Sequence, residues 1–137
     1  MSKETSEQCP CHSGLRYQDC CQRWHLGGVP ETPEQLMRSR YAAYALGLAD
    51  YIMATTSPQH PDGKTDATLR KEQILAFSKS TQFVGLTVLS VAQHGERGEV
   101  TFRALLRQGG EDASFTERSY FERHNGQWLY VSGEILP

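Results

Sequence analysis

Residues 115–131 read FTERSYFERHNGQWLYV, two runs of alternating apolar and polar side chains joined by Asn125-Gly126. Alternation of this kind is typical of a strand that packs one face against a core. Asn-Gly between such runs is a strong hairpin signal, because both positions of the turn need positive φ. This stretch therefore predicts an antiparallel β-hairpin.

Two more strand-like runs precede this hairpin. Residues 83–91 are rich in apolar and β-branched side chains, and residues 100–106 alternate like the later strands. Glycine-containing turns at residues 95–98 and 109–110 separate the runs. Because short turns join antiparallel neighbours, we expect four strands in one antiparallel meander.

Helical signals fill the region before the strands. Thr32 suits an N-cap, Pro33 suits the first helical position, and Gln35 completes a capping-box pattern. We expect this helix to break or bend at Gly47. Its apolar side chains recur at helical spacing and are Leu36, Met37, Tyr41 and Tyr44, with Leu48 extending the stripe.

Two further helices are predicted, over residues 48–54 and 69–77. Between them, residues 57–63 contain two prolines and a glycine and form a loop. Helices followed by strands, rather than alternating with them, indicate an α+β fold with the helices packed on one face of the sheet. The apolar side of the last helix is marked by Leu69, Gln73 or Ile74, and Phe77.

The composition is that of a globular domain. Of 137 residues, 38% are hydrophobic and 22% are charged, and the net charge of -2 gives no basic signal for nucleic-acid binding. No apolar run approaches the roughly 18 residues of a membrane span. Residues 1–8 are polar, so we expect a disordered tail rather than a secretion signal, and a cytoplasmic protein.

The four cysteines of the chain are concentrated near its start, as a Cys-Pro-Cys pair followed by a Cys-Cys pair. Four thiolates are the ligand set of a closed tetrahedral zinc site, and reducing conditions favour metal over disulfides. A closed coordination shell has no open position for a substrate. We therefore expect one structural Zn²⁺ ion bound by Cys9, Cys11, Cys20 and Cys21.

The alternatives to zinc are disulfides, thiols that bind nothing, and an iron–sulfur cluster. Cys20 and Cys21 are adjacent, which strains a mutual bridge, and the spacings differ from those usual for iron–sulfur proteins. His12 and His25 flank the cysteines. Four thiols need no further ligand, so we interpret both histidines as surface residues.

A candidate pocket follows from the alternation in residues 115–121. Aromatic residues share a face with Glu117, which indicates that this face points inward. A buried carboxylate needs a partner, and Arg40 is a better candidate than Arg38 because it lies beside the apolar stripe. The simpler interpretation is a structural ion pair between helix and sheet. The other is a ligand cavity lined by Arg40, Tyr44, Glu117 and Trp128.

The cysteine segment, residues 9–21, resembles the SEC-C zinc motif, the metal-binding tail of the SecA motor. Residues 36–44 (LMRSRYAAY), residues 115–121 and residues 126–131 (GQWLYV) resemble the YchJ-like family of bacterial proteins. The resemblance covers essentially the whole chain after residue 8.

This resemblance implies a SEC-C knuckle joined to a nuclear transport factor 2-like domain, a curved antiparallel sheet wrapped against helices around a cone-shaped cavity. His12 departs from the motif, which has glycine there, and a positive φ would suit histidine less well. The expected segments are a tail (residues 1–8), the knuckle (9–25), a linker (26–31) and the α+β domain (32–137).

The expected function is that of a binding or adaptor protein. The knuckle would dock onto a protein or ribonucleoprotein, with Trp24 as an anchor or as packing, and the cone would hold a ligand or partner. The alternative is a small-molecule enzyme with an acid or base in the cone, although no catalytic motif is present. Nucleic-acid binding by the knuckle has weaker support. A homodimer could use an apolar sheet face formed by Val84, Leu86 and Val88.

Overall fold

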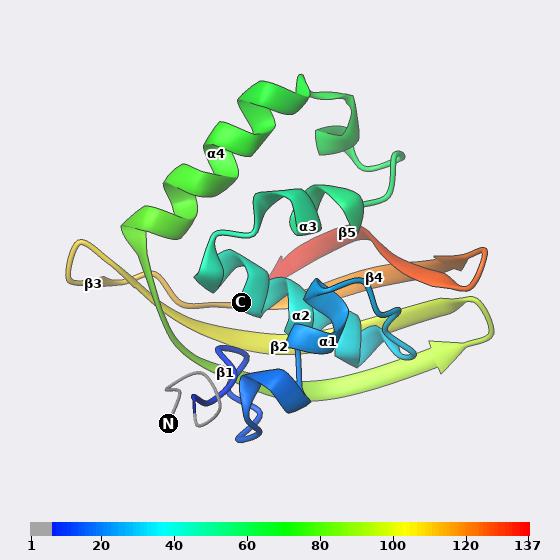
Figure 1. Cartoon of the computed structure of the whole chain (residues 1–137), viewed down its shortest axis with the longest axis horizontal. Coiled ribbons are helices and arrows are strands. Elements are labelled where there is room, and N and C mark those ends of the chain that lie inside the picture. Colours follow the sequence, from blue (N-terminus) through cyan, green and yellow to red (C-terminus); the bar gives the residue numbers. More distant parts are fainter. Residues whose placement is uncertain (1–6) are drawn as a thin grey trace.

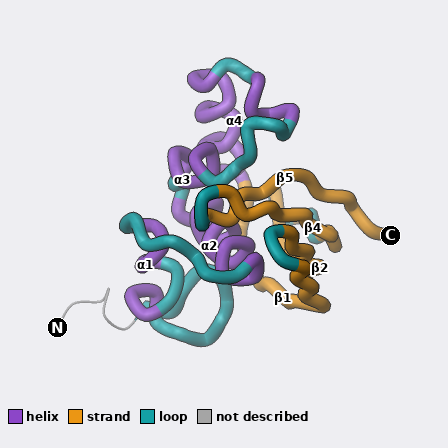
Figure 2. The backbone as a smooth tube through the Cα atoms, turned by 90° about the vertical axis from the view of Figure 1, so that its right-hand side faces the viewer, coloured by secondary structure: helices purple, strands orange, loops and turns teal. Residues whose placement is uncertain are grey.

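The computed structural model describes residues 7–137 and confirms the α+β fold, with the helices gathered on one face of an antiparallel sheet (Figure 1, Figure 2). The α-helices are α1 (Gln22–His25), α2 (Pro33–Leu46), α3 (Ala49–Ala54) and α4 (Ala67–Ser80), and two 3-10 turns are η2 (Tyr17–Asp19) and η3 (Pro61–Lys64). The strands are β1 (Thr81–His94), β2 (Arg97–Gln108), β3 (Glu111–Asp112), β4 (Phe115–His124) and β5 (Gln127–Leu136).

The long strands lie in the order β1-β2-β4-β5, which is the predicted meander. The short strand β3, which was not predicted, pairs with the end of β2. Residues Asn125 and Gly126 join β4 to β5 with φ angles of 52° and 80°. Two positive φ values are those of the expected hairpin turn, and they set the register that places Phe121 opposite Tyr130.

Helix α2 lies between the cysteine module and the sheet, and it begins where the sequence predicts. Thr32 Oγ1 accepts a hydrogen bond from Gln35 N (3.1 Å). The Gln35 side chain accepts from Glu31 N (2.7 Å), one residue earlier than in the predicted capping box. Gly47 ends the helix with φ 73°. The buried face of α2 can therefore pack on the sheet while both of its ends are satisfied.

Helix α4 buries the predicted Ile74 and Phe77, but the stripe begins at Arg70 and not at Leu69. Leu69 is 49% exposed, whereas Arg70 and Ile74 are buried and Phe77 is half-buried. Residues 70, 74 and 77 follow helical spacing and form one stripe. The prediction began the stripe at Leu69 because an arginine is usually a surface residue.

Strand β1 carries apolar side chains on both faces. Leu86 is buried and Val88 is half-buried, so the predicted dimer face of Val84, Leu86 and Val88 is wrong for these two residues. Irregularities at Val84 and Leu89 shift the alternation along the strand. The exposed apolar side chains of β1 are instead Val84, Leu89 and Val91.

The segment after α3 runs along the edge of the sheet and joins it to the helices. Thr56 forms a parallel bridge with Tyr130 of β5, and Ser57 N donates to Tyr130 O (2.7 Å). The edge strand is thereby covered at this point. Within residues 7–137, no helix has the length and apolar character needed to cross a membrane.

Candidate metal centre and core cavity

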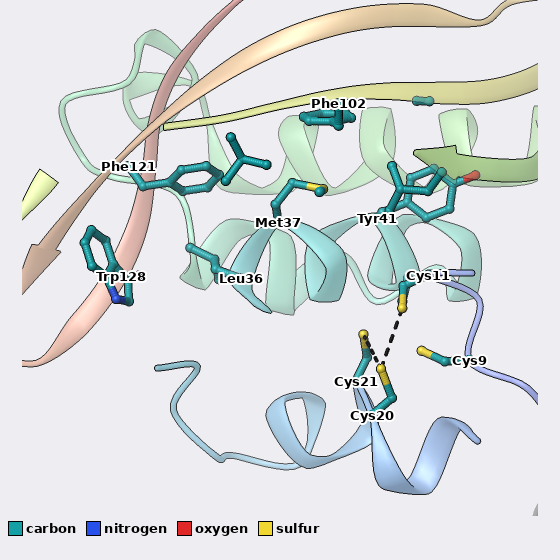
Figure 3. Close-up of a cluster of buried hydrophobic side chains, with 14 of the residues drawn as sticks. Cys9, Cys11, Cys20, Cys21, Leu36, Met37, Tyr41, Phe102, Phe121 and Trp128 are labelled. Atoms are coloured by element: carbon teal, nitrogen blue, oxygen red, sulfur yellow. Dashed lines mark hydrogen bonds between the residues drawn. The ribbon is translucent and has the colours of Figure 1, made fainter. Parts of the chain in front are cut away.

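The four cysteines form one buried cluster. Their Sγ atoms all lie within 4.8 Å of one another, and Figure 3 shows the sulfur atoms gathered beside α2. The Sγ atoms of Cys11 and Cys20 are 3.6 Å apart, and those of Cys20 and Cys21 are 3.9 Å apart. Tetrahedral coordination with Zn–S bonds of about 2.3 Å would place sulfur atoms roughly 3.8 Å apart. The donor set and its spacing therefore fit one such ion.

A tight loop brings the two cysteine pairs together. Cys9 N donates to Leu15 O (2.8 Å), and His12 N donates to Cys9 O (3.1 Å). His12 has φ 62° and Gly14 has φ 89°, which lets the chain reverse within a few residues. His12 therefore adopts a positive φ, which suits histidine less well than glycine.

The close contact of the four thiols shifts the pKa values of Cys9, Cys11 and Cys21 in opposite directions. A hydrogen bond from Cys21, together with one from Cys9, lowers the pKa of Cys11. The hydrogen bond with Cys11 raises the pKa of Cys9 to about 12, and it also raises the pKa of Cys21. A bound cation would replace the protons that this arrangement retains.

Both histidines of the knuckle attach it to the domain. His12 is exposed, as expected, whereas His25 is half-buried. His12 Nε2 is 3.2 Å from Phe83 O of β1, and His25 Nε2 is 2.8 Å from Ser39 O of α2. Arg38 also contributes, because its Nη1 donates to Cys11 O (3.2 Å) while Nε pairs with Glu34 of the same helix. Arg38 thus serves the knuckle rather than the pocket.

His25 sits at the centre of a polar network under the knuckle. Its Nδ1 is 2.6 Å from Tyr17 OH, and its ring packs edge-on against Tyr51 with centroids 4.8 Å apart. Tyr51 OH in turn bonds to Ser39 Oγ (2.7 Å). Burial lowers the pKa of His25, so the neutral ring is favoured in the folded protein.

The predicted tail and knuckle differ slightly from the structure. Gln8 forms a bridge with Arg16, and Tyr17 N donates to Glu7 O (3.0 Å), so residues 7 and 8 pair with the cysteine loop. The rest of the predicted tail, residues 1–6, lies outside the described residues. Trp24 is half-buried and carries the guanidinium of Arg23 over its ring at 4.5 Å.

A cavity of about 460 Å³ lies between the helices and the concave face of the sheet. It contains three of the four predicted pocket residues, Arg40, Tyr44 and Glu117. Trp128 lines a smaller hollow beside Trp24 instead and donates from Nε1 to Glu31 O (3.2 Å). Residues that line the main cavity include Met37, Thr56, His60, Asp62, Arg70, Phe77, Phe83, Phe102, Leu106, Phe115, Ser119 and Tyr130.

Arg40 is 8% exposed, and its polar contacts are all uncharged. Its Nη1 donates to Thr55 Oγ1 (2.7 Å), Ile52 O (3.1 Å) and Thr56 Oγ1 (3.1 Å). Its guanidinium lies over the ring of Tyr130 at 4.6 Å. Burial lowers the pKa of Arg40, and the charge of Arg70 lowers it further.

Glu117 does not pair with Arg40; its described partners are hydroxyl groups. Ser119 Oγ and Tyr130 OH (3.3 Å) both donate to Glu117 Oε2. A Cβ at Gly133 would overlap Glu117 Oε2 and would lie 2.6 Å from Tyr130 OH. Gly133 therefore leaves the space that these two side chains occupy. In place of the predicted ion pair, Tyr130 lies between the two residues, with its hydroxyl on Glu117 and its ring against Arg40.

Sequence reasoning missed several polar cavity residues, among them His60, Asp62, Arg70 and Tyr130. His60 lies in the predicted loop of residues 57–63, where its ring packs against Tyr130 with centroids 5.4 Å apart and Asp62 lies beside it. Tyr130 follows Trp128 at strand spacing, and Arg70 precedes Ile74 at helical spacing. Periodicity could therefore have placed both Tyr130 and Arg70 on the inner face. The position of His60 depends on loop conformation, which has no such periodicity.

Comparison with known proteins gives separate family matches for the cysteine module and for the α+β domain. A family model described as "YchJ, middle NTF2-like domain" matches residues 32–133, and the SEC-C motif matches residues 6–23. The solution structure of a SEC-C motif containing protein from Rhodopseudomonas palustris is 40% identical, covers 94% of this chain and 98% of its own, and has a TM-score of 0.81.

Two more solved structures extend this similarity. A SEC-C motif containing protein from Psychrobacter arcticus is 25% identical, covers 99% of this chain and 86% of its own, and has a TM-score of 0.78. An LEH-like epoxide hydrolase from M. tuberculosis is 14% identical, covers 78% of this chain and 86% of its own, and has a TM-score of 0.54. The last likeness is one of fold alone.

Proposed function

Because the chain belongs to the YchJ family, with an NTF2-like domain preceded by a SEC-C motif, we propose that it is a binding protein whose cone cavity holds a small ligand. The observation that carries this proposal is the open space of about 460 Å³ inside the α+β domain. Volumes of roughly 300–1,000 Å³ are usual for small-molecule sites. A few polar groups among aromatic walls are also usual, because they orient a ligand that the apolar surface binds.

The cavity is testable with a neutral, environment-sensitive dye such as N-phenyl-1-naphthylamine. Ala104 is 2% exposed and lines the cavity, so Ala104→Phe should fill part of it and abolish dye fluorescence. Arg103 is the neighbouring residue of β2 and is exposed, so Arg103→Phe is the matched control and should leave binding unchanged. Equal fluorescence with both variants would contradict a ligand site in the cavity.

The proposal includes one structural zinc ion held by Cys9, Cys11, Cys20 and Cys21, in a cytoplasmic protein whose thiols stay reduced. Thiolate ligands and burial of all four residues support it. When bound, zinc would hold the loop of the knuckle in its folded shape. Metal analysis of purified protein should give one zinc per chain, and Cys20→Ser should lower it. Substitution of the exposed Gln18 by Ser should not.

The adaptor part of the proposal assigns the outer side of the knuckle to a protein partner. Its support is the exposure of two apolar side chains, 53% for Leu15 in the cysteine loop and 79% for Leu26 directly after α1. Exposed apolar side chains of this kind suit a protein interface. In a pull-down, a partner recovered with the wild-type protein should be lost with Leu26→Ser. Equal recovery with both proteins would argue against docking through this surface.

A second candidate function, a small-molecule enzyme, has one specific observation in its favour. The Glu117 carboxyl group lines the cavity beside the Tyr130 hydroxyl, so an acid or base could reach a bound ligand. Consumption of a metabolite by the wild-type protein, lost in Glu117→Gln with its dye binding intact, would favour this function over simple binding.

A further inference from the structure

Arg70 is a buried cation without a counter-ion in the described part of the chain. Its side chain is 9% exposed and lines the cavity. Among residues 7–137, no carboxylate or hydroxyl accepts a hydrogen bond from its guanidinium. Burying a charge is costly unless it is paired, so an unpaired arginine facing an open cavity indicates a ligand of opposite charge.

Arg40 adds a second positive charge to the same cavity. Its Nη1 hydrogen bonds go to two hydroxyl oxygens and one carbonyl oxygen, none of which carries a charge. The charge of Arg70 is close enough to disfavour that of Arg40. Two repelling guanidinium groups in one cavity would both be stabilised by an anion placed between or beside them.

The acidic groups of the cavity do not form ion pairs with Arg40 or Arg70 in the described part of the chain. Glu117 accepts hydrogen bonds from Ser119 and Tyr130. The Asp62 side chain is 62% exposed, and its Oδ2 lies 3.7 Å from His60 Nδ1. Both nevertheless leave a negative field in the cavity. They favour a ligand with a single negative charge over a phosphate monoester, which carries about -1.5 to -2 charges at neutral pH.

The remainder of the cavity is apolar and aromatic. Phe77 packs against Phe83 with ring centroids 5.9 Å apart, and Phe102 packs against Phe115 at 6.4 Å. Leu106 and Met37 complete the wall. A ligand that fills the space must therefore present an apolar or aromatic body to these side chains.

We propose that the cone cavity binds a monocarboxylate with an apolar or aromatic body, with Arg70 as the principal carboxylate-binding residue and Arg40 as the second. This inference rests on the proposed binding function and names its ligand class. The planar guanidinium of arginine matches the two oxygens of a carboxylate, which gives such a pair both strength and orientation.

The test compares two probes of nearly equal shape, 2-naphthoate and its neutral amide, 2-naphthamide, by isothermal titration calorimetry on the zinc-loaded full chain. The wild-type protein should bind 2-naphthoate at least about tenfold more tightly than the amide. Arg70→Gln should lose about tenfold in affinity for 2-naphthoate and little for the amide, a difference of about 1.4 kcal/mol. Arg70→Lys should keep part of the preference, and the exposed Arg103→Gln, with the same charge change, should keep all of it.

Equal affinity for the two probes, absence of binding by 2-naphthoate, or an Arg70→Gln variant with unchanged preference would each overturn the inference. The neutral dye separates this failure from that of the proposed function. If the dye binds wild-type protein and Ala104→Phe abolishes it, a ligand cavity stands even when the carboxylate preference is absent. The circular dichroism spectrum of Arg70→Gln must match the wild type, and Arg70→Met provides a second neutral variant if it does not.

Discussion

Gly98 determines how closely the start of α2 can approach the sheet. It is buried in β2, and a Cβ there would overlap Pro33 Cγ at the start of α2 and lie 3.4 Å from the ring of Trp128. Because the proline ring is rigid, the overlap cannot be relieved by rotating a side chain. The close approach of helix and sheet at this point therefore requires glycine.

Gly98→Ala should lower the free energy of unfolding by about 1–3 kcal/mol, the usual cost of overpacking. Urea denaturation measures this change. Gln93 pairs with Gly98 across the strands but is exposed, so Gln93→Ala should change stability by less than about 0.5 kcal/mol. A Gly98→Ala variant as stable as the control would contradict the close packing described here.

Tyr130 predicts a dependence of stability on alkaline pH. Burial, and then the charge of Glu117, raise its pKa above the ordinary value. The unfolded chain therefore loses this proton first. The contribution of the protonated Tyr130 hydroxyl to the free energy of unfolding is complete below about pH 10, and it declines as the pH rises above that value.

Tyr130→Phe has no hydroxyl group to titrate. Its free energy of unfolding should fall less steeply than that of the wild type between about pH 9 and pH 11. Urea denaturation at each pH gives the two curves. Parallel curves would mean that the Tyr130 hydroxyl ionises as readily in the folded protein as in the unfolded chain.

How far single residues could be predicted depended on periodicity. Glu117 was placed in the cavity because strand alternation determines which face a side chain occupies. Arg70 was missed although it lies on the buried stripe of α4, since arginine is almost never buried without a partner. Residues placed by irregular segments, such as His60, could not be predicted from spacing.

The knuckle packs against the domain through several contacts and is not connected to it by the linker alone. The four cysteines belong to the same buried cluster as Leu36, Met37 and Tyr41 of α2, an arrangement visible in Figure 3. Polar contacts from His12, His25 and Arg38 reinforce the packing. A change at the cysteine cluster should therefore affect the stability of the whole domain.

Removal of the proposed metal ion should lower the melting temperature by roughly 5–10 °C, which for a domain of this size corresponds to about 2 kcal/mol. Calorimetry with and without a strong zinc chelator measures this shift. A Cys20→Ser variant, which lacks one ligand, should melt lower from the outset and respond less to the chelator. An unchanged melting temperature in both proteins would show that the cluster contributes nothing to folding.

The elements themselves were largely predictable. Caps, turn residues and alternation located α2, the β4–β5 hairpin and the meander, because each depends on local rules. The short β3 and the irregularities of β1 were not predicted. Both arise from pairing between strands, and a single sequence run does not reveal where a bulge interrupts that pairing.

In the whole molecule, the cavity is lined by the sheet, by α2 and α4, and by the segment after α3. The sheet provides Glu117 and Tyr130, while the helices provide Arg40 and Arg70, so the polar groups converge only when the domain is folded. A homodimer stays a prediction, although only Val84 of the three residues predicted for its interface is exposed. Neither the volume of the cavity nor the convergence of its charges could be derived from the sequence, because both depend on how far α4 stands from the sheet.

Backbone amide chemical shifts during titration with 2-naphthol, a neutral aromatic probe, test the ligand-binding cavity most directly. The amides of Arg40, Arg70, Ala104 and Glu117 should shift together, while those of Leu15 in the knuckle and Leu89 on the outer face of the sheet should not. Shifts confined to the knuckle or to the outer face, or no shifts at all, would contradict a ligand site inside the cone.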